Sequence, residues 1–219
     1  MRKIRYAVAM SLDGYIADSK GGADWIVHEP EINFAALFGQ FDTLLIGRKT
    51  YETMVKAGRT SVPGMKIFVF SRTMREKDFP GVSIIAKDAA KKVRALRTEE
   101  GKDIWLFGGG ELFRELLAEG SVDTVEVTVN PVLLGGGVKL LPGVVPDTRL
   151  RLVGNRIYGS GMVSLRYEVV RESQVSRWSG AWTLREIRAP PGERKLDERR
   201  VYVGAEARPS SARCVGVGR

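Results

Sequence analysis

The sequence contains one cysteine, Cys214, and one histidine, His28, in 219 residues. A single cysteine forms no disulfide framework, and one histidine beside it cannot build a multi-histidine or cysteine-rich zinc site. A serine–histidine–aspartate triad would have to use His28, which lies in a polar stretch where we expect it to be exposed and unused. These absences argue against most hydrolytic and zinc chemistries, predict no metal site, and favour a reducing, cytoplasmic setting.

Long apolar runs are missing as well. No stretch approaches the run of about 18 apolar residues that marks a membrane-spanning helix, so we expect no membrane contact. The N-terminus alternates, with Ile4, Tyr6 and Val8 as its apolar positions, which indicates a strand and not a signal peptide. Hydrophobic residues at 43% and charged residues at 28% are ordinary values for a globular protein with a sizeable core.

The charges are not balanced: the formal net charge is +9, which raises the question of nucleic-acid binding. Residues 173–219 hold ten basic and five acidic residues, whereas residues 1–172 hold 25 basic and 21 acidic residues. More than half of the excess therefore belongs to the C-terminal segment. A mildly basic first part suits a phosphorylated small molecule equally well, and we do not expect nucleic acid as a partner. The alternative is a nucleotide- or nucleic-acid-binding module that uses the basic tail.

Strand-like and helix-like segments alternate along residues 3–129. Apolar runs predict strands, and the helical spacing of apolar residues predicts helices. The expected strands are 3–10, 43–46, 66–70, 82–86, 104–107 and 122–129, and the expected helices are 32–41, 48–56, 88–98 (with Asp88 as N-cap) and 111–118. This alternation predicts an α/β fold with a mostly parallel central sheet.

The pattern changes after Pro131. Residues 149–158 and 162–170, separated by a Gly-Ser-Gly turn, predict a C-terminal antiparallel hairpin. Past residue 172 the periodicity fades, and prolines and scattered arginines follow. We therefore expect one domain over residues 1–172 and a basic, poorly ordered tail over residues 173–219.

Two of the expected strands end in residues that suit a phosphate group. Residues 47–50 (Gly-Arg-Lys-Thr) place two cations at a helix start, where they oppose the helix dipole unless an anion binds there. Ser71 and Arg72 follow the next strand, and guanidinium groups bind phosphate in a bidentate manner. Since ligands of α/β sheets bind beyond the carboxyl ends of the strands, the two segments together predict a phosphate clamp. Solvated charges at two turns remain the alternative.

Residues 108–110 are three consecutive glycines between an apolar strand and a helix. The strong patterning on both sides argues against a flexible linker. The spacing matches neither the G-x-G-x-x-G fingerprint nor the Walker A motif. Bare backbone at a strand-to-helix turn can approach a pyrophosphate. We therefore expect a bulky residue at Gly109 or Gly110 to abolish binding of such a ligand and to leave the core intact.

These motifs occur together with others in an order that resembles a known superfamily. The segments are residues 11–17 (SLDGYIA), 47–52 (GRKTYE), 71–72 (SR), 108–112 (GGGEL) and 130–137 (NPVLLGGG). They resemble the dihydrofolate reductase-like superfamily, and most closely the C-terminal reductase domain of bifunctional riboflavin deaminase–reductases and its stand-alone relatives. The resemblance covers about residues 2–171. The zinc-ligand signature of a deaminase is missing, so we expect a monofunctional protein.

The resemblance implies a three-layer fold and an NADPH-dependent reductase that transfers a hydride to a pteridine- or pyrimidine-type small molecule, as in the riboflavin pathway. It also implies a homodimer formed through the C-terminal part of the sheet. The implied cofactor-binding residues are Ile16, Ala17, Gly47, Arg48, Lys49, Thr50, Ser71, Arg72, Gly108, Gly109, Gly110, Glu111 and Leu112. Ile16 and Ala17 would cover the nicotinamide, and Ser71 and Arg72 would read the 2′-phosphate. Glycine turns of this kind can contain a cis peptide, which we expect between Gly108 and Gly109.

Asp13 and Glu31 are the candidate catalytic residues. Dihydrofolate reductases anchor the pteridine with a carboxylate on the first helix, and Glu31 lies nearest to that position, with Glu29 and Asn33 as neighbours. Acids at a helix start also favour the helix dipole, so a purely local role for Glu31 stays open. Asp13, in the loop expected to cover the nicotinamide, is the other candidate.

Aromatic residues cluster between residues 25 and 41. Their spacing predicts that Trp25, Phe34, Phe38 and Phe41 belong mostly to the core. Trp25 and Phe34 could instead line a pocket for a flat ring.

Overall fold

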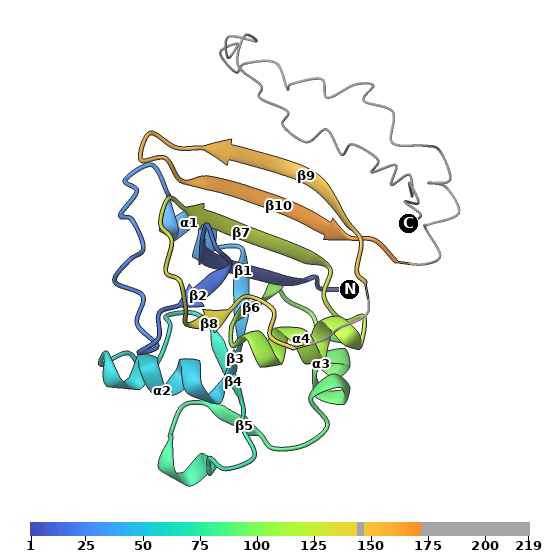
Figure 1. The fold of residues 1–219 in the computed structure, drawn as a ribbon. Coiled ribbons are helices and arrows are strands. Elements are labelled where there is room, and N and C mark those ends of the chain that lie inside the picture. Colours follow the sequence, from blue (N-terminus) through green and yellow to red (C-terminus); the bar gives the residue numbers. More distant parts are fainter. Residues whose placement is uncertain (144–146, 172–219) are drawn as a thin grey trace, which may run out of the picture. The chain divides into compact units, whose positions relative to one another are not determined.

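The computed structural model describes residues 1–143 and 147–171, which contain a central sheet of eight strands (Figure 1). In chain order these strands are β1 (Ile4–Ser11), β3 (Phe41–Gly47), β4 (Lys66–Phe70), β5 (Ser83–Ile85), β6 (Asp103–Gly108), β7 (Thr124–Asn130), β9 (Leu150–Ile157) and β10 (Val163–Val169). Across the sheet the order is β5-β4-β3-β6-β1-β7-β10-β9. Neighbours from β5 to β7 run parallel, and β10 is antiparallel to both β7 and β9. The predicted mostly parallel sheet with a C-terminal antiparallel hairpin is confirmed.

Helices cover both faces of this sheet. They are α1 (Phe34–Phe38), α2 (Arg48–Lys56), α3 (Ala89–Thr98) and α4 (Gly110–Ala118), with a short 3₁₀ helix, η1 (Glu76–Asp78). On one face, Val93, Leu96 and Leu116 of α3 and α4 share a buried cluster with Tyr6 and Leu106 of the sheet. On the other face, α1 and α2 contribute to a second cluster with side chains of β3 and β6. Figure 1 shows α2 on one side of β3 and β4 and the other two long helices on the opposite side. The expected three-layer α/β fold is confirmed.

A second, small sheet joins two loops, and the sequence does not predict it. In this sheet β2 (Tyr15–Ala17) pairs antiparallel with β8 (Val138–Lys139). Segments of two or three residues are too short to show a period of two. The pairing ties the loop after β1 to the loop after β7.

The first helix is shorter than predicted. Asn33 caps α1, since its side-chain oxygen accepts a hydrogen bond from Ala36 N at 2.9 Å, and the helix ends at Phe38. Phe41 begins β3 and is buried, whereas Phe34 and Phe38 are 48% and 40% exposed. The prediction of a core position is therefore right for Phe41 and wrong for Phe34 and Phe38. The reason is that a helix of five residues offers no long inward stripe to the sheet.

Asp88 stands at the start of α3, as predicted, but not as a capping side chain. Its φ of +55° lies in the left-handed region, and its side chain makes no capping hydrogen bond within the described residues. A capping side chain normally requires extended backbone at this position. The predicted boundary after residue 172 and the tail over residues 173–219 lie outside the described residues. No helix in the described ranges is long and apolar enough to cross a membrane.

The stacking of Tyr6 on Phe113 gives a test of the core. The two rings lie 3.8 Å apart between centroids and 12° from parallel, and both side chains are buried. Burial also raises the pKa of Tyr6. We expect Phe113→Ala to lower the free energy of unfolding by about 3–5 kcal/mol in a urea titration, because it leaves a cavity beneath α4.

Arg94→Ala is the control for this substitution. The Arg94 side chain is mostly exposed and lies 3.8 Å from a Glu119 oxygen, and an exposed pair of this kind contributes less than about 1 kcal/mol. Equal urea midpoints for the two variants would contradict the role of the ring stack.

Candidate functional site

Two neighbouring strands end in glycine, and their backbones meet. Ile46 of β3 is in register with Gly108 of β6. A Cβ added to Gly47 would lie 3.7 Å from Gly108 O and from Gly109 Cα, and one added to Gly109 would lie 3.4 Å from Gly47 Cα. The residues that the sequence singles out at two separate junctions are therefore in contact.

The chain leaves these two strands in opposite directions. After β3 it forms α2 on one face of the sheet, and after β6 it forms α4 on the other face (Figure 1). A point where adjacent parallel strands feed helices on opposite faces leaves a crevice at their carboxyl ends, and ligands of open α/β sheets bind there. The contact between Gly47 and Gly109 lies at this point.

Both helices begin without a side-chain cap. The N-cap residues are Gly47 for α2 and Gly109 for α4, and neither helix start has a side-chain capping bond among the described residues. The first backbone N–H groups of a helix have no partner within the helix and carry the positive end of its dipole. Two such helix starts beside one crevice make a site that suits an anion.

The end of β4 adds a hydroxyl and a guanidinium. β4 runs beside β3 with Phe70 in register with Gly47, so Ser71 and Arg72 follow next to the start of α2. Ser71 is buried, and its Oγ accepts hydrogen bonds from Thr73 N and Met74 N and also lies 3.5 Å from Thr73 Oγ1. Arg72 is exposed and makes no ion pair with any described residue.

The start of α2 carries the other two predicted cations. Arg48 Nη1 lies 2.8 Å from Glu52 Oε1, and both side chains are partly exposed. A pair of this kind contributes little to stability, so Arg48 can exchange Glu52 for another anion. Lys49 is exposed, and its ammonium group has no ion-pair partner in the part of the chain that the structure describes. The structure thus places the predicted phosphate-binding side chains along one edge of the sheet.

Packing and backbone geometry within the protein explain why residues 108–110 are all glycines. A Cβ on Gly108 would lie 3.1 Å from Thr50 Cγ2, and one on Gly110 would lie 2.6 Å from Lys139 O. Gly109 has a φ of +94°, which side chains disfavour. The expected cis peptide between Gly108 and Gly109 is not found, because every peptide bond in residues 1–143 and 147–171 is trans. The positive φ of Gly109 makes the sharp turn instead.

The two residues that follow the glycines differ in exposure. Glu111 is exposed and forms an ion pair with Arg114 at 3.0 Å, one turn further along α4. The Leu112 side chain is buried in the core. Of this pair, only Glu111 and the backbone amides are available to a ligand.

Asp13 accepts hydrogen bonds from two directions. Ser11 Oγ donates to its carboxylate at 2.6 Å, and the backbone N–H of Gly135, in the loop after β7, donates at 2.7 Å. These bonds, the Ser11 bond most of all, hold the pKa of Asp13 below its ordinary value. Its carboxylate is therefore ionised at neutral pH. Ile16 and Ala17, the predicted nicotinamide contacts, follow in β2 and are half-buried.

The acidic residues before α1 turn towards the C-terminal hairpin. Glu31 Oε2 lies 2.7 Å from Arg156 Nη2 of the edge strand β9, and β10, β7 and β1 lie between that strand and β6. Glu29 is buried and accepts a hydrogen bond from Glu31 N at 3.0 Å. The neighbouring Ser160 and this amide hold the pKa of Glu29 below its ordinary value. The exposed His28 directly precedes Glu29 in the same segment. The structure therefore does not bring Glu31 to the turn of three glycines at residues 108–110, which we call the glycine turn.

Asn130 is a residue of this edge to which the sequence assigns no role. It ends β7 in register with Ser11 of β1 and is completely buried. Its Oδ1 accepts a hydrogen bond from Val27 N at 2.9 Å, and its Nδ2 donates to Thr128 O at 3.1 Å. A polar residue directly after an alternating apolar strand is the signal that points to it. Asn130 holds the segment before α1 against the end of the sheet.

Aromatic rings lead from α1 to the glycine turn. Ring centroids are 6.0 Å apart for Phe34 and Phe38, 5.5 Å for Phe38 and Trp105, and 5.0 Å for Trp105 and Phe107. Phe107 directly precedes Gly108, and Trp105 Nε1 donates to Ala7 O at 2.9 Å. We call Phe34, Phe38, Trp105 and Phe107 the aromatic strip. Its exposed end, at Phe34 and Phe38, can receive a flat ring.

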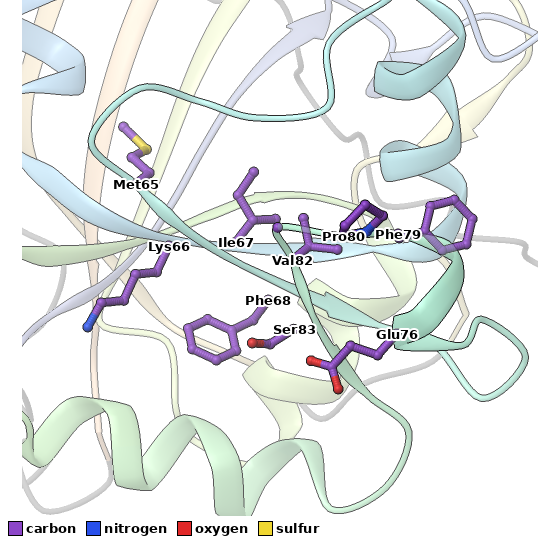
Figure 2. A pocket seen from close by; sticks show the side chains of 10 residues that line it. Met65, Lys66, Ile67, Phe68, Glu76, Phe79, Pro80, Val82 and Ser83 are labelled. Carbon is purple, nitrogen blue, oxygen red and sulfur yellow. The ribbon is translucent and has the colours of Figure 1, made fainter.

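A separate hollow lies at the other end of β4 and β5 (Figure 2). It is lined by residues 65–68, 79–83 and Glu76. Figure 2 shows Phe68 and Glu76 on one side of these strands and Ile67 and Val82 on the other. None of the predicted site residues lines it, so this hollow is separate from the candidate site at the carboxyl edge of the sheet.

Gly110 gives the most direct test of this geometry. We expect Gly110→Ala to lower the free energy of unfolding by about 1–3 kcal/mol in a urea titration, since the new methyl group would push the loop at Lys139 away. This differs from the expectation from sequence alone, because the packing of the protein changes together with the site.

Gly136→Ala is the matched control. A Cβ at Gly136 meets no described atom within 4 Å, and the residue does not have a positive φ. Equal losses of stability for the two variants would contradict the close approach of the Lys139 loop to α4.

Comparison with known sequences identifies relatives of the whole domain. The model of the RibD C-terminal domain family matches residues 2–164. The uncharacterized protein YyaP of Bacillus subtilis (strain 168) is 33% identical over 178 residues, which covers 76% of this chain and 94% of that protein.

Two solved structures share the fold. A "Putative riboflavin biosynthesis protein" from Shewanella sp. PV-4 superposes with a TM-score of 0.67 at 26% identity and covers 78% of this chain and 100% of its own. Dihydrofolate reductase from Enterococcus faecalis, solved with NADP(H), has a TM-score of 0.58 at 17% identity and covers 77% of this chain and 97% of its own. The strand order and these relatives agree: the chain belongs to the RibD C-terminal domain family, within the dihydrofolate reductase-like superfamily.

Proposed function

We propose that the chain is an NADPH-dependent reductase that transfers a hydride to a pteridine- or pyrimidine-type small molecule. Its family and its structural neighbours are those of reductases. The observation that carries the proposal is the pair of uncapped helix starts at Gly47 and Gly109, which meet at one crevice. A pyrophosphate is an anion that backbone amides of this kind bind.

The cations along the edge support a dinucleotide with an additional phosphate. In the proposed complex, the segment from Gly47 to Thr50 holds the pyrophosphate and the adenosine phosphate, with Arg48 and Lys49 supplying positive charge. Ser71 and Arg72 bind the 2′-phosphate, the serine through its hydroxyl and the arginine through its guanidinium, which has no ion-pair partner among the described residues. That phosphate distinguishes NADPH from NADH. The backbone from Gly108 to Leu112 lies against the pyrophosphate and the nicotinamide.

The proposed complex also places the substrate ring and the nicotinamide. Bound NADPH supplies a hydride to an electron-poor carbon of the substrate. In our proposal, the exposed end of the aromatic strip, Phe34 and Phe38, orients the flat acceptor ring, and Ile16 and Ala17 cover the nicotinamide from the loop side. Asp13 and Glu31 are engaged as hydrogen-bond and ion-pair acceptors. We therefore assign both carboxylates to holding loops in place and not to proton donation.

The 2′-phosphate assignment predicts a change of cofactor preference. We expect Arg72→Ala to weaken NADPH binding by about 10- to 100-fold, since a charge-assisted contact is lost, and to leave the weaker NADH binding unchanged. Titration of the reduced cofactors, followed by fluorescence, measures both affinities.

Arg94→Ala, which removes an exposed cation of α3, is the control for charge alone. Wild-type protein that binds neither dinucleotide, or that binds both equally, would contradict the proposed function.

The C-terminal hairpin supports the expected homodimer. The edge strand β9 exposes four apolar side chains, Leu150, Leu152, Val153 and Ile157. An apolar edge strand in water pairs readily with another strand or sheet. We propose that two copies of the chain associate through β9 and β10.

A charge on this strand tests the dimer. We expect Ile157→Glu to shift the protein from dimer to monomer in light scattering coupled to gel filtration, because Ile157 is 64% exposed and its replacement leaves the core intact. Unchanged thermal unfolding of the monomer would verify the fold, and a monomeric wild-type protein would refute the proposal.

A further inference from the structure

Asp13 joins two loops that are far apart in the sequence. Its carboxylate accepts hydrogen bonds from the backbone amides of Leu134 at 3.1 Å and Gly135 at 2.7 Å. The hydroxyl of the buried Ser11 donates to the same carboxylate and accepts a hydrogen bond from Tyr15 N at 2.9 Å. A carboxylate has the acceptor capacity for all three donors, and no neutral side chain of this size has it.

Backbone contacts continue on both sides of this carboxylate. Leu12 N donates to Val132 O at 2.9 Å, and Leu140 N donates to Gly14 O at 2.9 Å. In the small sheet, Ala17 is paired with Val138. The two loops, residues 11–17 and 131–140, therefore behave as one strap, which we call the Asp13 strap.

The Asp13 strap reaches the glycine turn. A Cβ on Gly110 would lie 2.6 Å from Lys139 O and 3.2 Å from Leu140 O. Ile16 and Ala17 stand on the opposite strand of the same small sheet. The position of these two side chains relative to α4 is thus set by the loop that Asp13 holds.

We propose that Asp13 is a positioning residue of the reductase site: its carboxylate fixes Tyr15–Ala17 beside the start of α4 and so forms the nicotinamide end of the site, without contributing to the phosphate end. The inference rests on the proposed function. It separates the two ends of the cofactor, because Ser71 and Arg72 directly follow β4 and, among the described residues, form no hydrogen bond or ion pair with the strap.

Asp18 provides a matched comparison within the same segment. Its carboxylate also accepts two amide hydrogen bonds, from Lys20 N and Gly22 N, both at 2.8 Å. Both donors belong to its own turn. Asp18→Asn therefore perturbs a carboxylate–amide turn without cutting the link to the loop after β7.

The experiment compares Asp13→Asn with Asp18→Asn. Calorimetric titration gives the affinity of each variant for NADPH and for adenosine 2′,5′-bisphosphate, a probe that carries only the phosphate end. We expect Asp13→Asn to weaken NADPH binding by about 10-fold, since hydrogen bonds to a charged acceptor are lost, and to leave the probe affinity within about twofold. Asp18→Asn should leave both affinities unchanged.

The outcomes separate the two proposals. Wild-type protein that binds neither compound would overturn the proposed function. Wild-type binding together with unchanged NADPH affinity in Asp13→Asn would overturn only the role of Asp13, and so would an equal loss for both compounds, because that result indicates general loosening. Should Asp13→Asn fail to fold, Ser11→Ala removes one donor of the same carboxylate, and it should weaken NADPH binding in the same direction and spare the probe.

Discussion

The contact between Gly47, which ends β3, and Gly108 and Gly109, where β6 ends and α4 begins, is the constraint on which the site depends. Because the strand ends come this close, the starts of α2 and α4 lie beside each other although the helices cover opposite faces of the sheet. Their first amides are left without side-chain caps among the described residues. Cations at Arg48 and Arg72 then surround a site that already favours negative charge. Such an arrangement is favourable when a multiply charged phosphate compound is bound.

The strands and helices that this crevice needs could be predicted from the sequence. The helix over residues 48–56 and the strand over residues 66–70 have the predicted bounds, because glycine, proline and a sharp change of period mark their ends. The parallel sheet and its closing hairpin follow from the alternation of short elements. The first helix was predicted too long, since Phe41 fits a helical period equally well but belongs to the buried start of β3.

The roles of individual residues were harder to predict, because their partners lie far away in the sequence. The glycine turn suggests bare backbone for a ligand, but the steric reason for Gly110 is the loop at Lys139. Asp13 and Glu31 suggest catalysis, yet their partners are an amide at Gly135 and a guanidinium at Arg156. Local spacing cannot reveal such contacts. The structure shows these partners, and the assignment of both acids to holding loops in place is our proposal.

A crystal structure of the protein with NADP⁺ tests the central claim most directly. The account predicts that the pyrophosphate lies within hydrogen-bond distance of backbone amides at the starts of both α2 and α4, and that the 2′-phosphate contacts Ser71 and Arg72. Electron density for the dinucleotide at another place, such as the hollow at the other end of β4 and β5, would contradict it.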